Sequence, residues 1–470
     1  MAAWIARPSL ARHKGSVDPV RQVRAAIARW RATFAQRFVD RARGCEPAPV
    51  AWPREPLALL AAAGAMLPGE APAAAAHLAR AAAERRLEPA REKLDEWRAG
   101  SLAVGRDRLP LRDALAELRL GQSARGPALL RGIEASLAAP LPAVLEAHRA
   151  AARAATRLWA ELGQPPHADA GPEAAERRAT AQAWLTDTDG VVADLVDAAD
   201  LPGLLRRLRW PAGDRGFRSA QRFRKAGARW APLGLERELA RAVQVEPPHR
   251  EGHPGARVWV VAPGRDVRIV PSDLELGWQS ELAAARAVGR ALARALVGPL
   301  PAPLQYASVG STARALGDLG AQVFAEPRPL REEGLGRRDA EEVRRRVGLW
   351  LLLETRWCCA SILAPPVVAG PEEQRALAAE AARRALGVPV PPWVATLGLL
   401  PSAAPRLRAL LGALRLWGAL RERWDEDWYR NPRASEALRE ACERGGAYSV
   451  EAWCADLGAA RPLPRLLELL

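Results

Sequence analysis

The stretch Arg286-Ala287-Val288-Gly289-Arg290 lies in the segment of the chain that is most informative about its fold. Small and apolar side chains recur around it at helical spacing, at Leu282, Ala285, Gly289, Leu292 and Leu296. Three arginines follow at intervals of four residues beside this apolar stripe, at 286, 290 and 294. The pattern predicts a helix over 280–297, with Ser280 as its N-cap and Gly298-Pro299 after its end.

Two short strands are predicted immediately before this helix, over 257–261 and 266–270. The sequence Ala262-Pro263-Gly264-Arg265 supplies the turn between them, so a small sheet is expected over 257–271. A second helix is predicted after the first, over 309–325, and it contains Asp318. Strand signals are weak elsewhere, which predicts a mostly α-helical chain with this one small sheet.

These elements resemble the core of the M3 and M32 families of zinc peptidases, the oligoendopeptidase type. In that core, His-Glu-x-Gly-His supplies two zinc ligands and the base that activates water. Here Arg286 and Arg290 stand at the ligand positions, Ala287 at the base position, and Asp318 where the third ligand is expected. The resemblance covers 257–329 and 391–458, and its C-terminal part includes Asp427-Trp428-Tyr429.

The resemblance implies an elongated, multi-helix, zincin-like fold. It divides the chain into an N-terminal helical half, residues 1–245, and a C-terminal half, residues 246–470, that carries the degenerate core. Arginine offers no lone pair to a metal at neutral pH. The resemblance therefore implies that the catalytic residues, the zinc site and any cofactor have been lost. The expected function is binding of an unknown peptide or protein partner by an inactive homologue.

Arg286 and Arg290 allow two interpretations. They form a solvated basic flank beside the apolar stripe, as charged runs usually do, or they point into the former zinc cleft. A buried pair of guanidinium groups needs a carboxylate, because an unpaired buried charge costs several kcal/mol, on the order of 3–5. Asp318 is then the expected partner.

Two other functions remain open from the sequence. An active hydrolase with an unrecognised site would use His249 and His253, whose spacing suits metal ligands but whose loop is rich in proline and glycine. A basic helical protein that binds nucleic acid would use the segment 215–230, where arginines alternate with Phe217, Phe223 and Trp230. We favour the simpler interpretation of that segment, an amphipathic helix with its aromatic residues in the core.

The composition of the chain indicates which partners and which cellular compartment are compatible with it. The net charge is +15, but lysine occurs only at 14, 93 and 225, so the positive charge is nearly all arginine. The five cysteines have no disulfide or zinc-finger spacing, which is typical of a reducing compartment. Cys358, inside an apolar helix, is expected to be structural. No apolar run is long enough for a membrane span and no signal peptide is evident, so a cytoplasmic protein is expected.

Overall fold

The computed structural model describes residues 18–43, 45–47, 50, 66, 70–104, 107–120, 125–161, 172–209, 217, 221–248, 256–272, 277–306, 312–364, 372–392, 394–395, 403–445, 448–459 and 461–470. His249 and His253, and residues 309–311 of the second predicted helix, lie outside these ranges. The N-terminal half contains α1 (Pro19–Ala42), α3 (Glu70–Ala99), α4 (Leu111–Leu120), α5 (Gly126–Leu137), α6 (Leu141–Glu161), α7 (Pro172–Leu195), α8 (Leu201–Leu208), α10 (Arg222–Ala228) and α11 (Glu236–Ala242).

The C-terminal half is also mostly helical, as predicted. It contains α12 (Trp278–Ala295), α13 (Ala302–Tyr306), α14 (Thr312–Phe324), α15 (Pro327–Glu332), α16 (Arg337–Leu363), α17 (Glu372–Leu386), α19 (Ala403–Trp424), α20 (Ala434–Glu443), α21 (Val450–Asp456) and α22 (Leu463–Leu469). Short 3-10 helices, η3 (Ala231–Leu233) and η5 (Trp428–Arg430), connect some of these elements.

The predicted sheet is present and has one strand more than expected. β4 (Ala256–Ala262) and β5 (Asp266–Pro271) pair antiparallel around the turn at Gly264, whose positive φ of 71° suits glycine. β3 (Val243–Val245) pairs parallel with β5 on its other side, giving the order β3-β5-β4. The sequence assigned β3 to a helix, because the three residues Val-Gln-Val carry too little signal to outweigh the helical pattern before them.

A second departure from the sequence prediction is a β-hairpin near residue 105. β1 (Ser101–Val104) and β2 (Asp107–Pro110) pair antiparallel, whereas strands were expected only in the sheet before α12. Leu102 and Val104 are buried in a local core with α4 and α5. Packing against those two helices stabilises a hairpin that intrinsic strand propensity does not predict.

The sequence predicted the presence of the helices better than the residues at which they begin. α12 begins at Trp278 with Gly277 as its N-cap, so Ser280 does not cap it and instead lies buried in its first turn. α20 begins at Ala434, and no side chain caps its start. At the start of α21 the Ser449 hydroxyl is the N-cap and accepts a hydrogen bond of 3.1 Å from the amide of Ala452.

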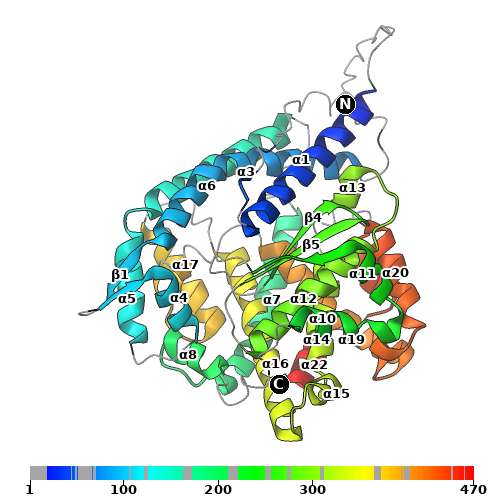
Figure 1. The fold of residues 1–470 in the computed structure, drawn as a ribbon. Coiled ribbons are helices and arrows are strands. Elements are labelled where there is room, and N and C mark those ends of the chain that lie inside the picture. The colour runs from blue at the N-terminus through cyan, green and yellow to red at the C-terminus, as the bar shows by residue number, and fades with distance from the viewer. Residues whose placement is uncertain are drawn as a thin grey trace.

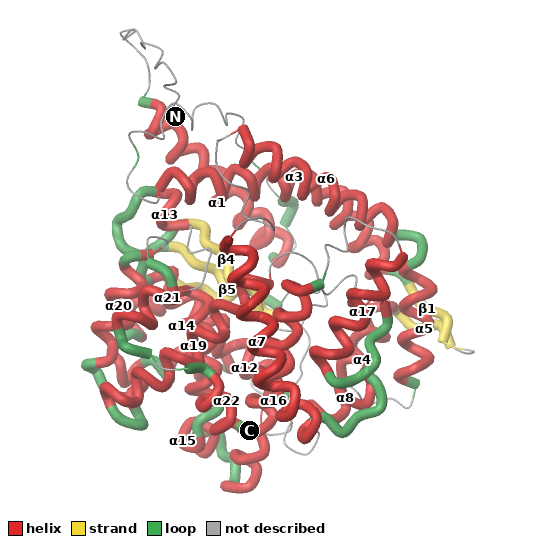
Figure 2. Tube along the Cα trace, turned by 180° about the vertical axis from the view of Figure 1, so that it is seen from behind, coloured by secondary structure: helices red, strands yellow, loops and turns green. Residues whose placement is uncertain are grey.

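The centre of the molecule is built on the close contact of α12 with α14. Figure 1 shows these helices beneath β4 and β5, with α1 against β4, and α3 beside α6 along one edge. Figure 2 shows the same arrangement from behind, where α7 lies beside α16. Val267 and Ile269 of β5 are fully buried in one core cluster with residues of α12 and α14. Among the described residues, no single helix is both long and apolar enough to cross a membrane.

Glycines allow the two central helices to approach at backbone distance. A Cβ atom at Gly289 would lie 2.5 Å from the carbonyl oxygen of Leu316, and one at Gly317 would lie 2.7 Å from that of Arg286. Both distances are far below a normal van der Waals contact. This close approach brings the side chains of Arg286 and Asp318 together across the two helices.

Candidate functional site

Four charged side chains form an ion-pair network between the central helices. On α12, Arg286 places its Nη2 atom 2.7 Å from Glu354 Oε2 of α16, and its Nε atom 2.9 Å from Asp318 Oδ1 of α14. The first contact is an aligned hydrogen bond, whereas the second is an ion pair without hydrogen-bond alignment. Arg286 is therefore held by two carboxylates, one from α14 and one from α16.

Arg406 of α19 completes the network. Its two terminal nitrogens donate to the two oxygens of Asp318 at 2.6 and 2.9 Å, the bidentate geometry that suits a guanidinium and a carboxylate. Its Nε atom donates to Glu354 Oε1 at 2.9 Å. Two cations and two anions thus balance each other, and both oxygens of Asp318 are engaged. Asp318 itself is only 1% exposed.

The network determines the charge state of its members. Burial alone would raise the pKa of Glu354, but the charges of Arg286 and Arg406 lower it to about 2. Burial likewise would lower the pKa of Arg406, but Asp318 and Glu354 raise it above its usual value. Glu354 is therefore ionised throughout the neutral range and is not a general base.

The other two sequence-identified positions lie outside the network. Arg290 donates from Nη2 to the carbonyl oxygen of Ala256 at 3.1 Å and from Nε to that of Arg286 at 3.2 Å. Burial, followed by repulsion from Arg406, lowers its pKa to about 10. Ala287 is fully buried in the apolar core, away from the charged side chains.

Glu354 and Arg406 were not singled out from the sequence. Glu354 directly follows the apolar run at 347–353, and a charge there in an otherwise buried helix is a signal for a buried ion pair. Its partners lie on α12 and α19, more than fifty residues away in either direction. No local pattern connects them, so the network is visible only in the folded chain.

Cys358 and His77 are both buried, and burial shifts the pKa of each in the direction that favours its neutral form. Burial raises the pKa of Cys358 to about 12, so its thiol is not activated. His77 is buried, with Nε2 3.1 Å from the carbonyl oxygen of Pro303, and burial lowers its pKa well below the usual value. In the part of the chain that the structure describes, no three His, Cys, Asp or Glu side chains are grouped as metal ligands.

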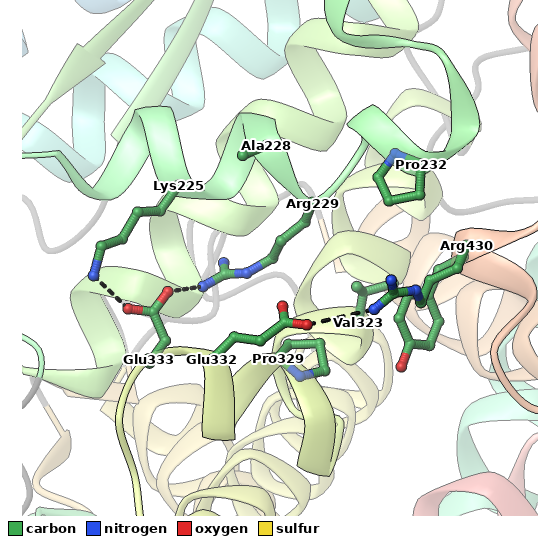
Figure 3. A pocket seen from close by; sticks show the side chains of 10 residues that line it. Lys225, Ala228, Arg229, Pro232, Val323, Pro329, Glu332, Glu333 and Arg430 are labelled. Carbon is green, nitrogen blue, oxygen red and sulfur yellow. Dashed lines mark hydrogen bonds and ion pairs between the residues drawn. The ribbon is translucent and has the colours of Figure 1, made fainter.

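The basic segment near residue 220 packs as the simpler interpretation expects. Phe217 and Trp230 are buried, and Phe223 packs against the core. The cations line a cavity of about 290 Å³, where Lys225 and Arg229 both bind Glu333 and Arg430 lies 3.4 Å from Glu332 (Figure 3). These positive charges are balanced by carboxylates of α15 and of the turn that follows it.

Glu281 of α12 is a buried carboxyl group whose oxygens accept no hydrogen bond from a described residue. Burial raises its pKa to about 7, against the opposing charge of Arg229. The pKa of Glu281 in the folded state lies above its ordinary value of 4.5. The protein therefore keeps its full free energy of unfolding below about pH 4.5, where the carboxyl group is protonated, and loses part of it as pH rises through about 7. At higher pH the ionised group destabilises the fold by on the order of 3 kcal/mol.

Glu281→Gln should remove that loss, because glutamine resembles the protonated acid and does not ionise. We expect the variant and the native protein to have similar free energies of unfolding near pH 4.5. The variant should become more stable by on the order of 3 kcal/mol at pH 8. Urea denaturation at several pH values measures the free energy of unfolding of the variant and of the native protein. Parallel pH profiles for the two proteins would show that Glu281 is solvated or paired.

Comparison with known proteins identifies the fold. No protein-family model matches the chain, and no curated protein matches it. Solved structures do match over nearly the whole length. A Bacillus anthracis protein assigned as oligoendopeptidase F is 12% identical, with a TM-score of 0.56 over 96% of this chain and 84% of that one. The M32 carboxypeptidase of Deinococcus radiodurans is 15% identical, with a TM-score of 0.51 over 96% of this chain and 98% of that one.

A carboxypeptidase from Pyrococcus furiosus is similar as well, at 11% identity and a TM-score of 0.55, with 97% of this chain and 99% of that one covered. The chain has the mostly α-helical fold of the M3 and M32 peptidases. The resemblance inferred from the strand pair and the two helices is thus confirmed at the level of the fold. At such identities the likeness concerns the fold alone.

Proposed function

We propose that this chain is a catalytically inactive relative of the M3 and M32 peptidases that binds a peptide or protein. The supporting observation is the ion-pair network of Arg286, Asp318, Glu354 and Arg406. Arg286 and Asp318 are two of the positions at which the sequence resemblance expects zinc ligands. In this chain they are bound to each other.

The residues present do not fit a catalytic zinc ion. Arg286 and Arg290 remain protonated at neutral pH and repel a cation. Both oxygens of Asp318 are already held by Arg406, so the carboxylate would have to give up two charge-assisted hydrogen bonds to bind a metal. Ala287, at the position of the base, lies in the apolar core and offers no group that could activate water.

An inactive protein with this fold retains the capacity to bind. The network fixes α12, α14, α16 and α19 to one another by contacts that do not need a metal ion. In place of a zinc ion and its ligands, the interior carries guanidinium groups, which recognise carboxylates and other anions. Binding without cleavage is the function that this arrangement supports best.

Peptidase assays test the proposal. Protein purified without chelator should cleave neither an unstructured protein substrate nor a mixed peptide library, with or without added zinc. The decisive control is Arg286→Ala/Arg290→Ala. Chelator-sensitive cleavage by the native protein that this variant retains would show an active hydrolase with another site, and His249→Ala/His253→Ala would then test the loop outside the described residues.

A further inference from the structure

A cavity of about 290 Å³ is lined by residues of α10, η3, α14, α15 and η5 and by the residues that directly follow α10 and α15 (Figure 3). None of these lining residues belongs to the ion-pair network. The volume lies at the lower limit of small-molecule sites, which measure about 300–1,000 Å³. The cavity therefore has room for a molecule of the size of an amino acid or a dipeptide.

The buried charges of this cavity are already paired. Glu333, whose side chain is 7% exposed, accepts a hydrogen bond of 2.5 Å from Lys225 Nζ and one of 2.7 Å from Arg229 Nη2. The negative charges of Glu281 and Glu332 also act on Arg229. The contacts of Glu333 join α10 to the end of α15 and form one wall of the cavity.

The exposed charges of the cavity, Glu332 and Arg430, are joined only loosely. Their side chains are 60% and 33% exposed, and a contact of 3.4 Å links Arg430 Nη1 to Glu332 Oε1. The same oxygen lies 3.4 Å from Arg328 Nε. Both distances exceed the usual range of about 2.7–3.2 Å for such hydrogen bonds. Figure 3 shows the side chains of Glu332 and Arg430 reaching toward each other, so one small ligand can contact both.

Apolar side chains make up much of the remaining lining. They come from α10, η3, α14 and α15, and they are Ala228, Pro232, Val323 and Pro329. Apolar ligand surface that leaves water for such a lining contributes about 25 cal/mol per Å² to binding. The cavity thus offers a surface for a hydrocarbon side chain together with two exposed charges of opposite sign.

We propose that this cavity binds a small zwitterion with an apolar side chain, an amino acid or a dipeptide. The ligand carboxylate pairs with Arg430, its ammonium group pairs with Glu332, and its side chain packs on the apolar lining. The charges of the lining nearly balance, since three cations oppose two carboxylates: Lys225, Arg229 and Arg430 against Glu332 and Glu333. A ligand without net charge therefore fits better than a polyanion. The inference goes beyond the proposed function, because it concerns a second site and a small ligand.

Isothermal titration calorimetry with leucine and leucyl-leucine tests the proposal. Both molecules carry a carboxylate, an ammonium group and an apolar side chain, and the one that binds more tightly shows whether the site takes an amino acid or a dipeptide. N-acetyl-leucine lacks the ammonium group, leucinamide lacks the carboxylate, and glycine lacks the side chain. Each of these three should bind at least about tenfold more weakly than leucine.

Two alanine-to-tryptophan variants test whether the ligand lies in the cavity. Ala228 lines the cavity and Ala240 of α11 does not, and both are exposed. Ala228→Trp should weaken leucine binding at least about tenfold by filling the space, whereas Ala240→Trp should bind like the native protein. Both variants should keep the native melting temperature, because neither side chain enters the core.

Two charge variants test the contacts of the ligand. Arg430→Gln and Glu332→Gln should each weaken leucine binding at least about tenfold. Their folding is expected to be nearly unchanged, because exposed ion pairs contribute little to stability. Arg383→Gln removes one partner of the exposed pair with Glu380 and should bind leucine like the native protein.

Three results would overturn the proposal. N-acetyl-leucine binding as tightly as leucine would show a site for anions and not for zwitterions. Equal leucine affinities of Ala228→Trp and Ala240→Trp would show that the ligand binds outside the cavity. The third is the absence of binding of both leucine and leucyl-leucine up to about 10 mM. The peptidase assays test the proposed function separately from all of these measurements.

Discussion

Asp318→Asn is expected to destabilise the protein by about 3–5 kcal/mol, the largest effect of any single substitution considered. The carboxylate is 1% exposed and accepts contacts from both Arg286 and Arg406. Asparagine fills nearly the same volume but carries no charge. The variant therefore leaves two guanidinium groups to share Glu354, with one positive charge uncompensated in the interior.

Chemical denaturation of Asp318→Asn and of a control variant measures this effect. Glu380→Gln removes one partner of an exposed pair with Arg383, and it should leave the free energy of unfolding nearly unchanged. If Asp318→Asn lowers the free energy of unfolding no more than the control variant does, the interior arginines are solvated. The network would then not hold the four helices together.

Gly289→Ala is expected to cost about 3 kcal/mol, because the added methyl group has no space. Its Cβ atom would lie 2.5 Å from the carbonyl oxygen of Leu316 and 2.9 Å from Gly317 Cα. Both neighbours are backbone atoms, so the whole of α14 must move away from α12. That movement also separates Arg286 from Asp318, and the variant loses part of the network as well as its packing.

Gly190→Ala provides the matched control for this prediction. Gly190 lies inside α7, and no atom lies within 4 Å of a Cβ built there. Alanine should stabilise that helix by about 0.5–1 kcal/mol, since glycine loses more backbone entropy on folding. We therefore expect Gly289→Ala to lower the free energy of unfolding and Gly190→Ala to raise it. A neutral Gly289→Ala would mean that the two central helices are less tightly packed than the structure shows.

The sequence predicted the local features of the centre well, because these depend on short-range patterns. The turn at Pro263-Gly264, the strand on either side of it and the apolar stripe of α12 are each encoded within a few residues. Gly289 also followed from the sequence resemblance, and the structure gives its physical reason in the close approach of α14. β3 was missed because its stability depends on pairing with β5, more than twenty residues later.

The candidate site was predicted only in part for the same reason. Residue spacing and the resemblance together indicated Asp318 as the partner of Arg286, and the two side chains are in contact. The other half of the network comes from α16 and α19, and neither helix carries a local motif that identifies Glu354 or Arg406. Ala287 lies in the apolar core and not beside the charged side chains. No sequence pattern distinguishes such a core alanine from an alanine that stands at an empty catalytic position. The division at residue 245 stays a prediction, although β3 pairs with β5 across it.

Zinc content measures most directly whether arginine–carboxylate pairs have replaced a metal site. The protein should be purified without chelator from zinc-supplemented medium, passed through gel filtration, and measured by inductively coupled plasma mass spectrometry. We expect far less than one equivalent of zinc per chain, because Arg286 and Arg290 cannot ligate a cation and Asp318 is held by Arg406. A full equivalent of zinc that chelator removes and that Asp318→Asn abolishes would contradict the replacement.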